Sequence, residues 1–253
     1  MSAGWLWAEW PLAGRVLAGV STREGGVSGP PWGALNLGLH VGDRPAHVLE
    51  NRRHLAATLA LPADPGWLRQ VHGVKVARLG ALEAQPEIEA DAAVAFEPGV
   101  VCAVMTADCL SVVLADRAAR CVGVAHAGWR GLAGGVLEAT IAALGVSPAE
   151  LFAWLGPAIS QRCYEVGDEV REAFVTADPG AAAAFVPNAR DRWQADLALL
   201  AQRRLAAAGV SQVSGGGFCT FSDRARFHSH RRDGAASGRM ATLAWLPGGP
   251  QRA

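Results

Sequence analysis

The sequence predicts an α+β layered sandwich, in which strands and helices mix without strict βαβ alternation. Two observations lead to this fold class. Short β-branched apolar runs in the middle of the chain are typical of buried strands, and later segments repeat apolar residues at helical spacing. Because the chain has no linker or low-complexity tract, we expect one domain over residues 1–253.

The elements follow from these patterns in chain order. VVCAVMTA and CLSVVLAD, around residues 100–116, and CVGVAHAG, residues 121–128, predict strands. GLAGGVLEATIAALG, residues 131–145, predicts one helix because its leucines and valines recur at helical spacing and Gly145 is a natural C-cap. The remaining expected elements are a strand running into a turn at 151–160, helices at 167–176 and 195–210, and strands at 213–220 and 237–246, the last two joined by a polar connection.

Composition excludes several classes of protein. The 23 basic residues balance 23 acidic ones, so no global charge favours nucleic acid or an anionic membrane. The N-terminus lacks the basic region of a signal peptide, and no stretch approaches the roughly 18 apolar residues of a membrane span. Five cysteines without a CxxC pair are expected to be reduced thiols. We therefore expect a soluble cytoplasmic protein.

Two candidate functional residues lie in residues 106–131, TADCLSVVLADRAARCVGVAHAGWRG. This stretch places Cys109 and His126 in two strand-like segments. They could be a nucleophile with its base, two metal ligands, or two polar core residues. A catalytic zinc site needs a third protein ligand, and His72 in LRQVHGVKV is the best candidate because it lies in a short strand-like stretch beside Gly73. His72, Cys109 and His126 would together form a two-His, one-Cys site.

Six segments in order resemble one known family: STREGGVSGPPWGALNLGLHVGD, QVHG, MTADCLSVVLAD, VGVAHAGWRG, LGPAISQRCYEVGDEV and SHRRDGAASGRMA. They are similar to the bacterial laccase-domain family, also called multicopper polyphenol oxidase-like, over nearly the whole chain. The resemblance implies a single-domain α/β/β/α sandwich of stacked mixed sheets with helices outside. It also implies a zinc site formed by His72, Cys109 and His126.

The activity that this resemblance implies is a zinc-dependent purine nucleoside phosphorylase acting on adenosine, inosine and methylthioadenosine, with adenosine deaminase as a side activity. Its partners would be purine nucleosides and phosphate, and its catalytic residues the same three ligands. Three alternatives remain open: a peptidoglycan-precursor editing hydrolase using zinc-activated water or a Cys109–His126 dyad, a polyphenol oxidase, and a non-catalytic metal-binding protein. Zinc is favoured over copper because a multicopper centre needs more histidines than the seven present.

Phosphorolysis requires an anion pocket. Arg23 in STREGG, Arg130 after the HAGW turn and Arg231 in SHRRDG are the substrate-binding candidates, since an arginine can hold phosphate by a bidentate fork. Asp91 and Asp108 are candidates for a general acid or base, with turn capping as the structural alternative.

Overall fold

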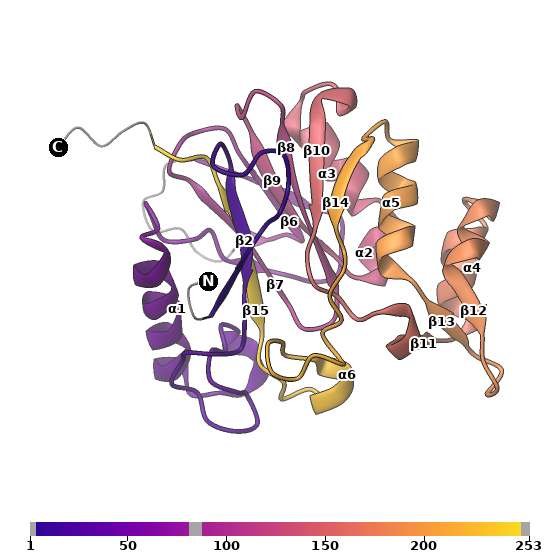
Figure 1. The fold of residues 1–253 in the computed structure, drawn as a ribbon, viewed down its shortest axis with the longest axis horizontal. Coiled ribbons are helices and arrows are strands. Elements are labelled where there is room, and N and C mark those ends of the chain that lie inside the picture. Colours follow the sequence, from indigo (N-terminus) through magenta and orange to yellow (C-terminus); the bar gives the residue numbers. More distant parts are fainter. Residues whose placement is uncertain (1–3, 81–87, 249–253) are drawn as a thin grey trace.

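The structure of the protein is a computed structural model that describes residues 4–80 and 88–248. Two β-sheets stacked face to face form its centre (Figure 1). The antiparallel four-stranded sheet has the order β1 (Trp5–Trp7), β2 (Leu17–Ser21), β15 (Met240–Trp245) and β7 (Val101–Thr106). The mixed six-stranded sheet has the order β14 (Gln212–Gly215), β10 (Leu151–Leu155), β8 (Leu110–Asp116), β9 (Val122–Ala127), β6 (Ala92–Ala95) and β4 (Val76–Leu79).

The space between the two sheets is filled by alternate residues of their strands. Val113 of β8, Val124 of β9 and Trp154 of β10 meet Val20 and Val104 of the four-stranded sheet in one buried cluster. Because side chains in a strand alternate between faces, the intervening residues point away from this core. The same alternation decides which side chains reach the candidate site.

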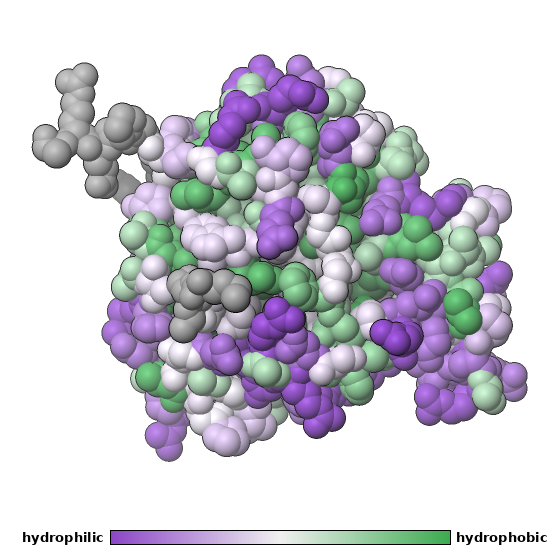
Figure 2. Space-filling view, in the orientation of Figure 1, coloured by the Kyte–Doolittle hydropathy of each residue, from purple (hydrophilic) through white to green (hydrophobic). Residues whose placement is uncertain are grey.

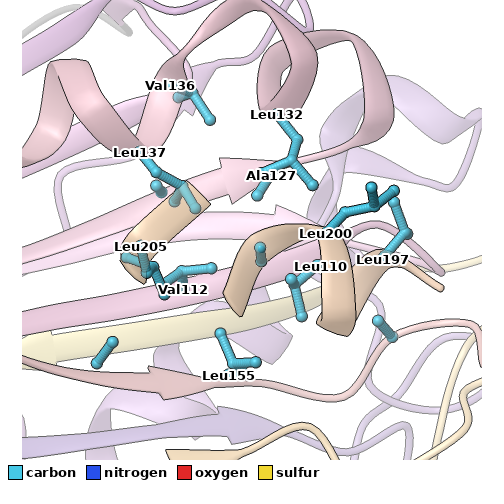
Figure 3. Close-up of a cluster of buried hydrophobic side chains, with 14 of the residues drawn as sticks. Leu110, Val112, Ala127, Leu132, Val136, Leu137, Leu155, Leu197, Leu200 and Leu205 are labelled. Atoms are coloured by element: carbon cyan, nitrogen blue, oxygen red, sulfur yellow. The ribbon is translucent and has the colours of Figure 1, made fainter. Parts of the chain in front are cut away.

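Helices cover the outer face of each sheet. Helix α1 (Pro45–Leu59) packs on the four-stranded sheet through Leu55. Helices α2 (Trp129–Gly134), α3 (Val136–Leu144) and α5 (Leu197–Ala207) cover the other face of the six-stranded sheet, where their leucines meet Leu110, Val112 and Leu155 (Figure 3). The α/β/β/α layering is thus confirmed.

The smaller elements lie around this sandwich. A three-stranded sheet, with helix α4 (Asp168–Val175) beside it, lies beyond α5 at the right of Figure 1. On the face of the molecule seen in Figure 1, hydrophilic residues are widespread and hydrophobic residues are scattered between them (Figure 2). The remaining elements are β11 (Glu165–Val166), β13 (Trp193–Ala195) and β12 (Phe185–Pro187) of that sheet, the pair β3 (Leu68–Arg69) and β5 (Ile88–Glu89), and helices α4 (Asp168–Val175) and α6 (His230–Asp233).

Two expectations about single elements were wrong, and one helix was not foreseen. The helix expected at 131–145 is two helices, α2 and α3, because Gly135 adopts a left-handed backbone with φ of 101° that ends the first. The strand expected at 213–220 ends at Gly215, where two successive glycines turn the chain. Helix α1 was not expected, since Asn51 interrupts its buried face.

None of the helices in the described ranges is long and apolar enough to cross a bilayer.

Candidate functional site

Strand alternation brings two of the three expected ligands to one place. Leu110 of β8 pairs with Ala127 of β9 at the end of the ladder, so Cys109, directly before Leu110, and Gly128, directly after Ala127, lie side by side beyond this last pair. His126 lies opposite Ser111, and Cys109 is two residues before Ser111, so both side chains lie on the same face of the sheet. Ser111 hydrogen-bonds Thr242 of the other sheet at 2.7 Å. Cys109 and His126 therefore face the space between the sheets, at its open end.

The link from Thr106 to Leu110 explains this position. Strand β7 belongs to the four-stranded sheet and β8 to the six-stranded one, so the TADC segment carries the chain from one sheet to the other. Asp108 in this link has a φ of 92°, which is rare for a residue with a side chain. Its carboxylate accepts hydrogen bonds from the Thr220 and Ser229 hydroxyls and the Arg231 backbone N–H, which hold the link in place. Asp108 thus acts as a structural anchor next to Cys109.

His72 reaches the same place from a loop, not from the strand-like stretch expected. Strand β3 ends at Arg69, and His72 has a left-handed backbone with φ of 60°. The Gln70 side chain fixes the start of this loop by exchanging two hydrogen bonds with the backbone of Met105, at 2.7 and 2.8 Å. Ligand atoms of His72, Cys109 and His126 all lie within 4.8 Å of one another, so the structure brings these three residues together.

Asp91 organises this cluster. Its fully buried carboxylate accepts the backbone N–H groups of Val71, His72 and Gly73 at 3.1, 2.9 and 2.7 Å. It also accepts Nδ1–H of His126 at 2.8 Å, which leaves Nε2 of that ring free to bind a metal ion or take a proton. Burial alone would raise the pKa of Asp91, but the bonds from His126, Gly73 and Val71 outweigh it and lower that pKa.

The thiol and the imidazole shift each other's ionisation. Burial alone would raise the pKa of Cys109, but the charge and hydrogen bond of His126, helped by those of His72, lower it to about 6. Burial would conversely lower the pKa of His126, but the Cys109 thiolate and the Asp91 carboxylate raise it to about 9. Near neutral pH the metal-free pair is therefore a thiolate beside an imidazolium.

Glycine leaves room for the cluster at the turn that faces it. A Cβ atom on Gly128 would lie 3.0 Å from Sγ of Cys109, 3.2 Å from Cδ2 of His72 and 3.4 Å from Nε2 of His126. Gly131 is needed in the same way, because its Cβ would lie 2.8 Å from the Gly73 carbonyl oxygen. The glycines of HAGWRG thus let the QVHG loop and the TADC link come close together. Two imidazoles and one thiolate are a donor set that zinc accepts.

The cluster lies in the wall of a cavity of about 600 Å³ between the open ends of the two sheets. Apolar side chains, including Leu68, Met105 and Ile159, form much of the wall, and Tyr164 lies beside them. Its arginines are Arg69, Arg231 and Arg239. The volume is in the range of small-molecule sites.

Of the three arginines expected to bind substrate, Arg231 is among the residues that line the cavity, and Arg23 and Arg130 are not. The backbone N–H of Arg23 donates a hydrogen bond to the Arg226 carbonyl oxygen, and its guanidinium donates one to the Arg224 carbonyl oxygen. Arg130 is exposed and stacks on Trp129 at the start of α2. Sequence reasoning missed Arg239, although it stands in the quoted motif SHRRDGAASGRMA, since the pattern does not show which arginine faces a cavity.

The chain is similar to known proteins over nearly its whole length. The family model described as multi-copper polyphenol oxidoreductase laccase matches residues 17–247. A Pseudomonas aeruginosa protein named purine nucleoside phosphorylase is 55% identical over 245 residues, covering 96% of this chain and 98% of that protein. Escherichia coli YfiH, which carries the same name, is 51% identical over 238 residues, covering 94% of this chain and 97% of YfiH.

Solved structures show the same fold. A Neisseria meningitidis protein of the DUF152 family has a TM-score of 0.91 and 47% identity, covering 97% of this chain and 100% of its own. YlmD from Geobacillus stearothermophilus has a TM-score of 0.92 and 32% identity, covering 98% of both chains. On the match over residues 17–247 and the identity to these relatives, the chain belongs to the multi-copper polyphenol oxidoreductase laccase family.

Proposed function

We propose that this protein is a zinc-dependent purine nucleoside phosphorylase that acts on adenosine, inosine and methylthioadenosine, with adenosine deaminase as a side activity. Relatives that are 41–55% identical carry the name purine nucleoside phosphorylase. The observation that carries the proposal is that the His72–Cys109–His126 cluster and the guanidinium-bearing Arg231 and Arg239 line one cavity. A nucleoside and a phosphate ion would therefore meet in a single site.

In this proposal His72, Cys109 and His126 hold zinc, which when bound supplies a Lewis acid for a substrate oxygen or a water. Asp91 keeps Nδ1 of His126 protonated, so that Nε2 stays available on the cavity side. The apolar wall around Met105 and Ile159 buries the nucleoside and excludes water from the glycosidic bond. Arg231 contributes positive charge for phosphate. Neither Asp91 nor Asp108 is assigned the acid–base role, because both carboxylates are occupied by hydrogen bonds.

The test is product analysis on adenosine, with and without phosphate, using protein whose zinc content has been measured. We expect adenine and ribose 1-phosphate only when phosphate is present, inosine in either case, and about one zinc per chain. The Cys109→Ala variant should lose both zinc and turnover. Adenine release that is equal without phosphate would refute phosphorolysis, and stoichiometric zinc in Cys109→Ala would refute the ligand assignment.

A second candidate function is favoured by one observation. Asp91, His126 and Cys109 form a carboxylate–imidazole–thiol chain, the arrangement of a nucleophilic triad as well as of a metal ligand set with its supporting carboxylate. It would suit a thiol hydrolase, such as a peptidoglycan-precursor editing enzyme. Full hydrolytic activity after verified removal of zinc would favour this thiol-based function over the zinc-dependent one.

A further inference from the structure

Arg239 differs from the other arginines of the cavity in how firmly its side chain is held. Its backbone N–H donates to Oδ1 of Asn36 at 2.9 Å, and its Nη1 donates to the Ser237 and Gly238 carbonyl oxygens at 2.6 and 3.2 Å. Its aliphatic stem packs on Gly38, where a Cβ atom would lie 2.7 Å from Cγ of Arg239. The guanidinium is thus fixed before any ligand arrives.

The other edge of this guanidinium has no hydrogen-bond partner among the residues that the structure describes. Within residues 4–80 and 88–248, neither Nε nor Nη2 of Arg239 donates a hydrogen bond and no carboxylate forms an ion pair with it. Neither atom is sealed in the protein interior. Because Arg239 lines the cavity, this free edge is available there to a ligand.

No carboxylate of the described residues forms an ion pair with Arg239. Burial is the main influence on this group and lowers its pKa, while Cys109 and Asp108 favour the charged form only from a distance. The Asp108 carboxylate is already occupied by Thr220, Ser229 and the Arg231 backbone. A partly desolvated cation without a counter-ion is unfavourable, and an anion in the cavity would relieve that cost.

The two other arginines of the wall lack this combination. Arg69 is exposed and pairs with Glu89. Arg231 is exposed, and its Nη1 donates to the Glu165 carbonyl oxygen at 3.0 Å. Of the three, Arg239 alone is mostly buried, fixed and unpaired among the described residues.

We infer that Arg239 is the residue that anchors phosphate in this cavity, with Nε and Nη2 as a two-pronged donor to two phosphate oxygens and Arg231 as a second source of positive charge. The inference rests on the proposed phosphorolysis for its choice of anion. It names a residue that fixes the position of the attacking phosphate relative to the nucleoside.

The experiment measures inorganic phosphate binding to the zinc-loaded protein by titration calorimetry, and the phosphate KM of base release from inosine. Arg239→Met removes the charge at similar length, and Arg239→Lys keeps the charge without the fork. The matched control is Arg52→Met, because Arg52 is also half-buried but its Nε and Nη2 already donate to the Leu37 carbonyl oxygen. All variants are checked for zinc content and thermal unfolding.

We expect Arg239→Met to raise the phosphate Kd and KM by about 10- to 100-fold, Arg239→Lys to raise them less, and Arg52→Met to leave them unchanged. Inosine affinity without phosphate should be unaffected in all three. Wild-type phosphate affinity in folded Arg239→Met or Arg239→Lys protein, equal losses of phosphate and inosine binding, or no phosphate binding to the wild type would each overturn the inference. Arg239-dependent phosphate binding without phosphate-dependent base release would support the anion site and refute the proposed function.

Discussion

Replacing Asp91 by Asn tests the part of the site on which the other residues depend. Oδ1 of Asp91 accepts from His72 N and His126 Nδ1, and Oδ2 accepts from Val71 N and Gly73 N. Each carboxylate oxygen accepts two N–H groups. If the amide nitrogen of Asn takes the place of either oxygen, those two N–H groups face another donor and lose their hydrogen bonds. Two fully buried donors without partners would cost about 2–6 kcal/mol in the free energy of unfolding, and the loss here lies toward the lower end because the backbone donors of Val71, His72 and Gly73 are only part-buried.

Metal affinity should fall as well, because His126 loses the carboxylate that fixes its tautomer and the QVHG loop loses its anchor. A lost carboxylate partner of a histidine ligand typically weakens metal binding about 10- to 100-fold. Stability should also respond to pH. The folded pKa of Asp91 is below its ordinary 3.8, so its contribution is present above pH 3.8 and is lost as pH falls through the folded value. Asp91→Asn should lack this acid-dependent loss.

Asp116 provides a matched control. It too is fully buried, and it accepts backbone N–H groups of Ala118, Arg120 and Cys121 and the Arg120 side chain. It lies at the far end of β8, about 20 Å along the strand from Cys109. Both Asn variants should lower the unfolding free energy of the metal-free protein, measured in urea, but only Asp91→Asn should weaken zinc binding against a competing chelator. Equal zinc affinity in the two variants would show that Asp91 supports the fold and not the metal site.

Two further predictions address the cluster itself. In metal-free protein, the rate of Cys109 alkylation by iodoacetamide should rise as pH increases through about 6, because thiolate forms above that pKa, while buried Cys102 and Cys121, each with a pKa of about 12, stay unreactive. A midpoint near the ordinary thiol value of about 8.5 would contradict the thiolate–imidazolium pair. Gly128→Ala should lower zinc affinity by about 10-fold, since its Cβ would press on Sγ of Cys109, whereas Gly29→Ala, which has open space around it, should bind zinc normally. Unchanged zinc affinity in Gly128→Ala would mean that the cluster has more room than the contact distances allow.

The fold was predictable where one local signal dominated. β-Branched runs predicted β7, β8 and β9, and helical spacing with Gly145 predicted α3 and its end. Assignment of β7 and β8 to different sheets could not be predicted, because neighbouring strands more often pair with each other. That crossing places Cys109 at the end of the sandwich.

The residue types of the candidate site were predictable, but their surroundings were not. The motifs singled out His72, Cys109 and His126, whose side-chain chemistry limits what they can do. They did not separate Arg23, whose guanidinium contacts Arg224, from Arg239, which faces the cavity. Such distinctions depend on contacts more than 200 residues apart in the chain, such as Arg23 with Arg224, which no local pattern records.

The place of β15 in its sheet has a consequence for how the protein is made. Residues 240–245 lie between β2, residues 17–21, and β7, residues 101–106, so neither of those strands has its central partner until β15 has left the ribosome. Pairings this distant in sequence form slowly. Arg239 directly precedes β15 and completes the cavity wall at the same moment. During synthesis the three metal-ligand candidates thus emerge long before the wall opposite them, and a nascent chain that has emerged from the ribosome as far as residue 126 displays the thiol of Cys109 without the wall that Arg239 completes.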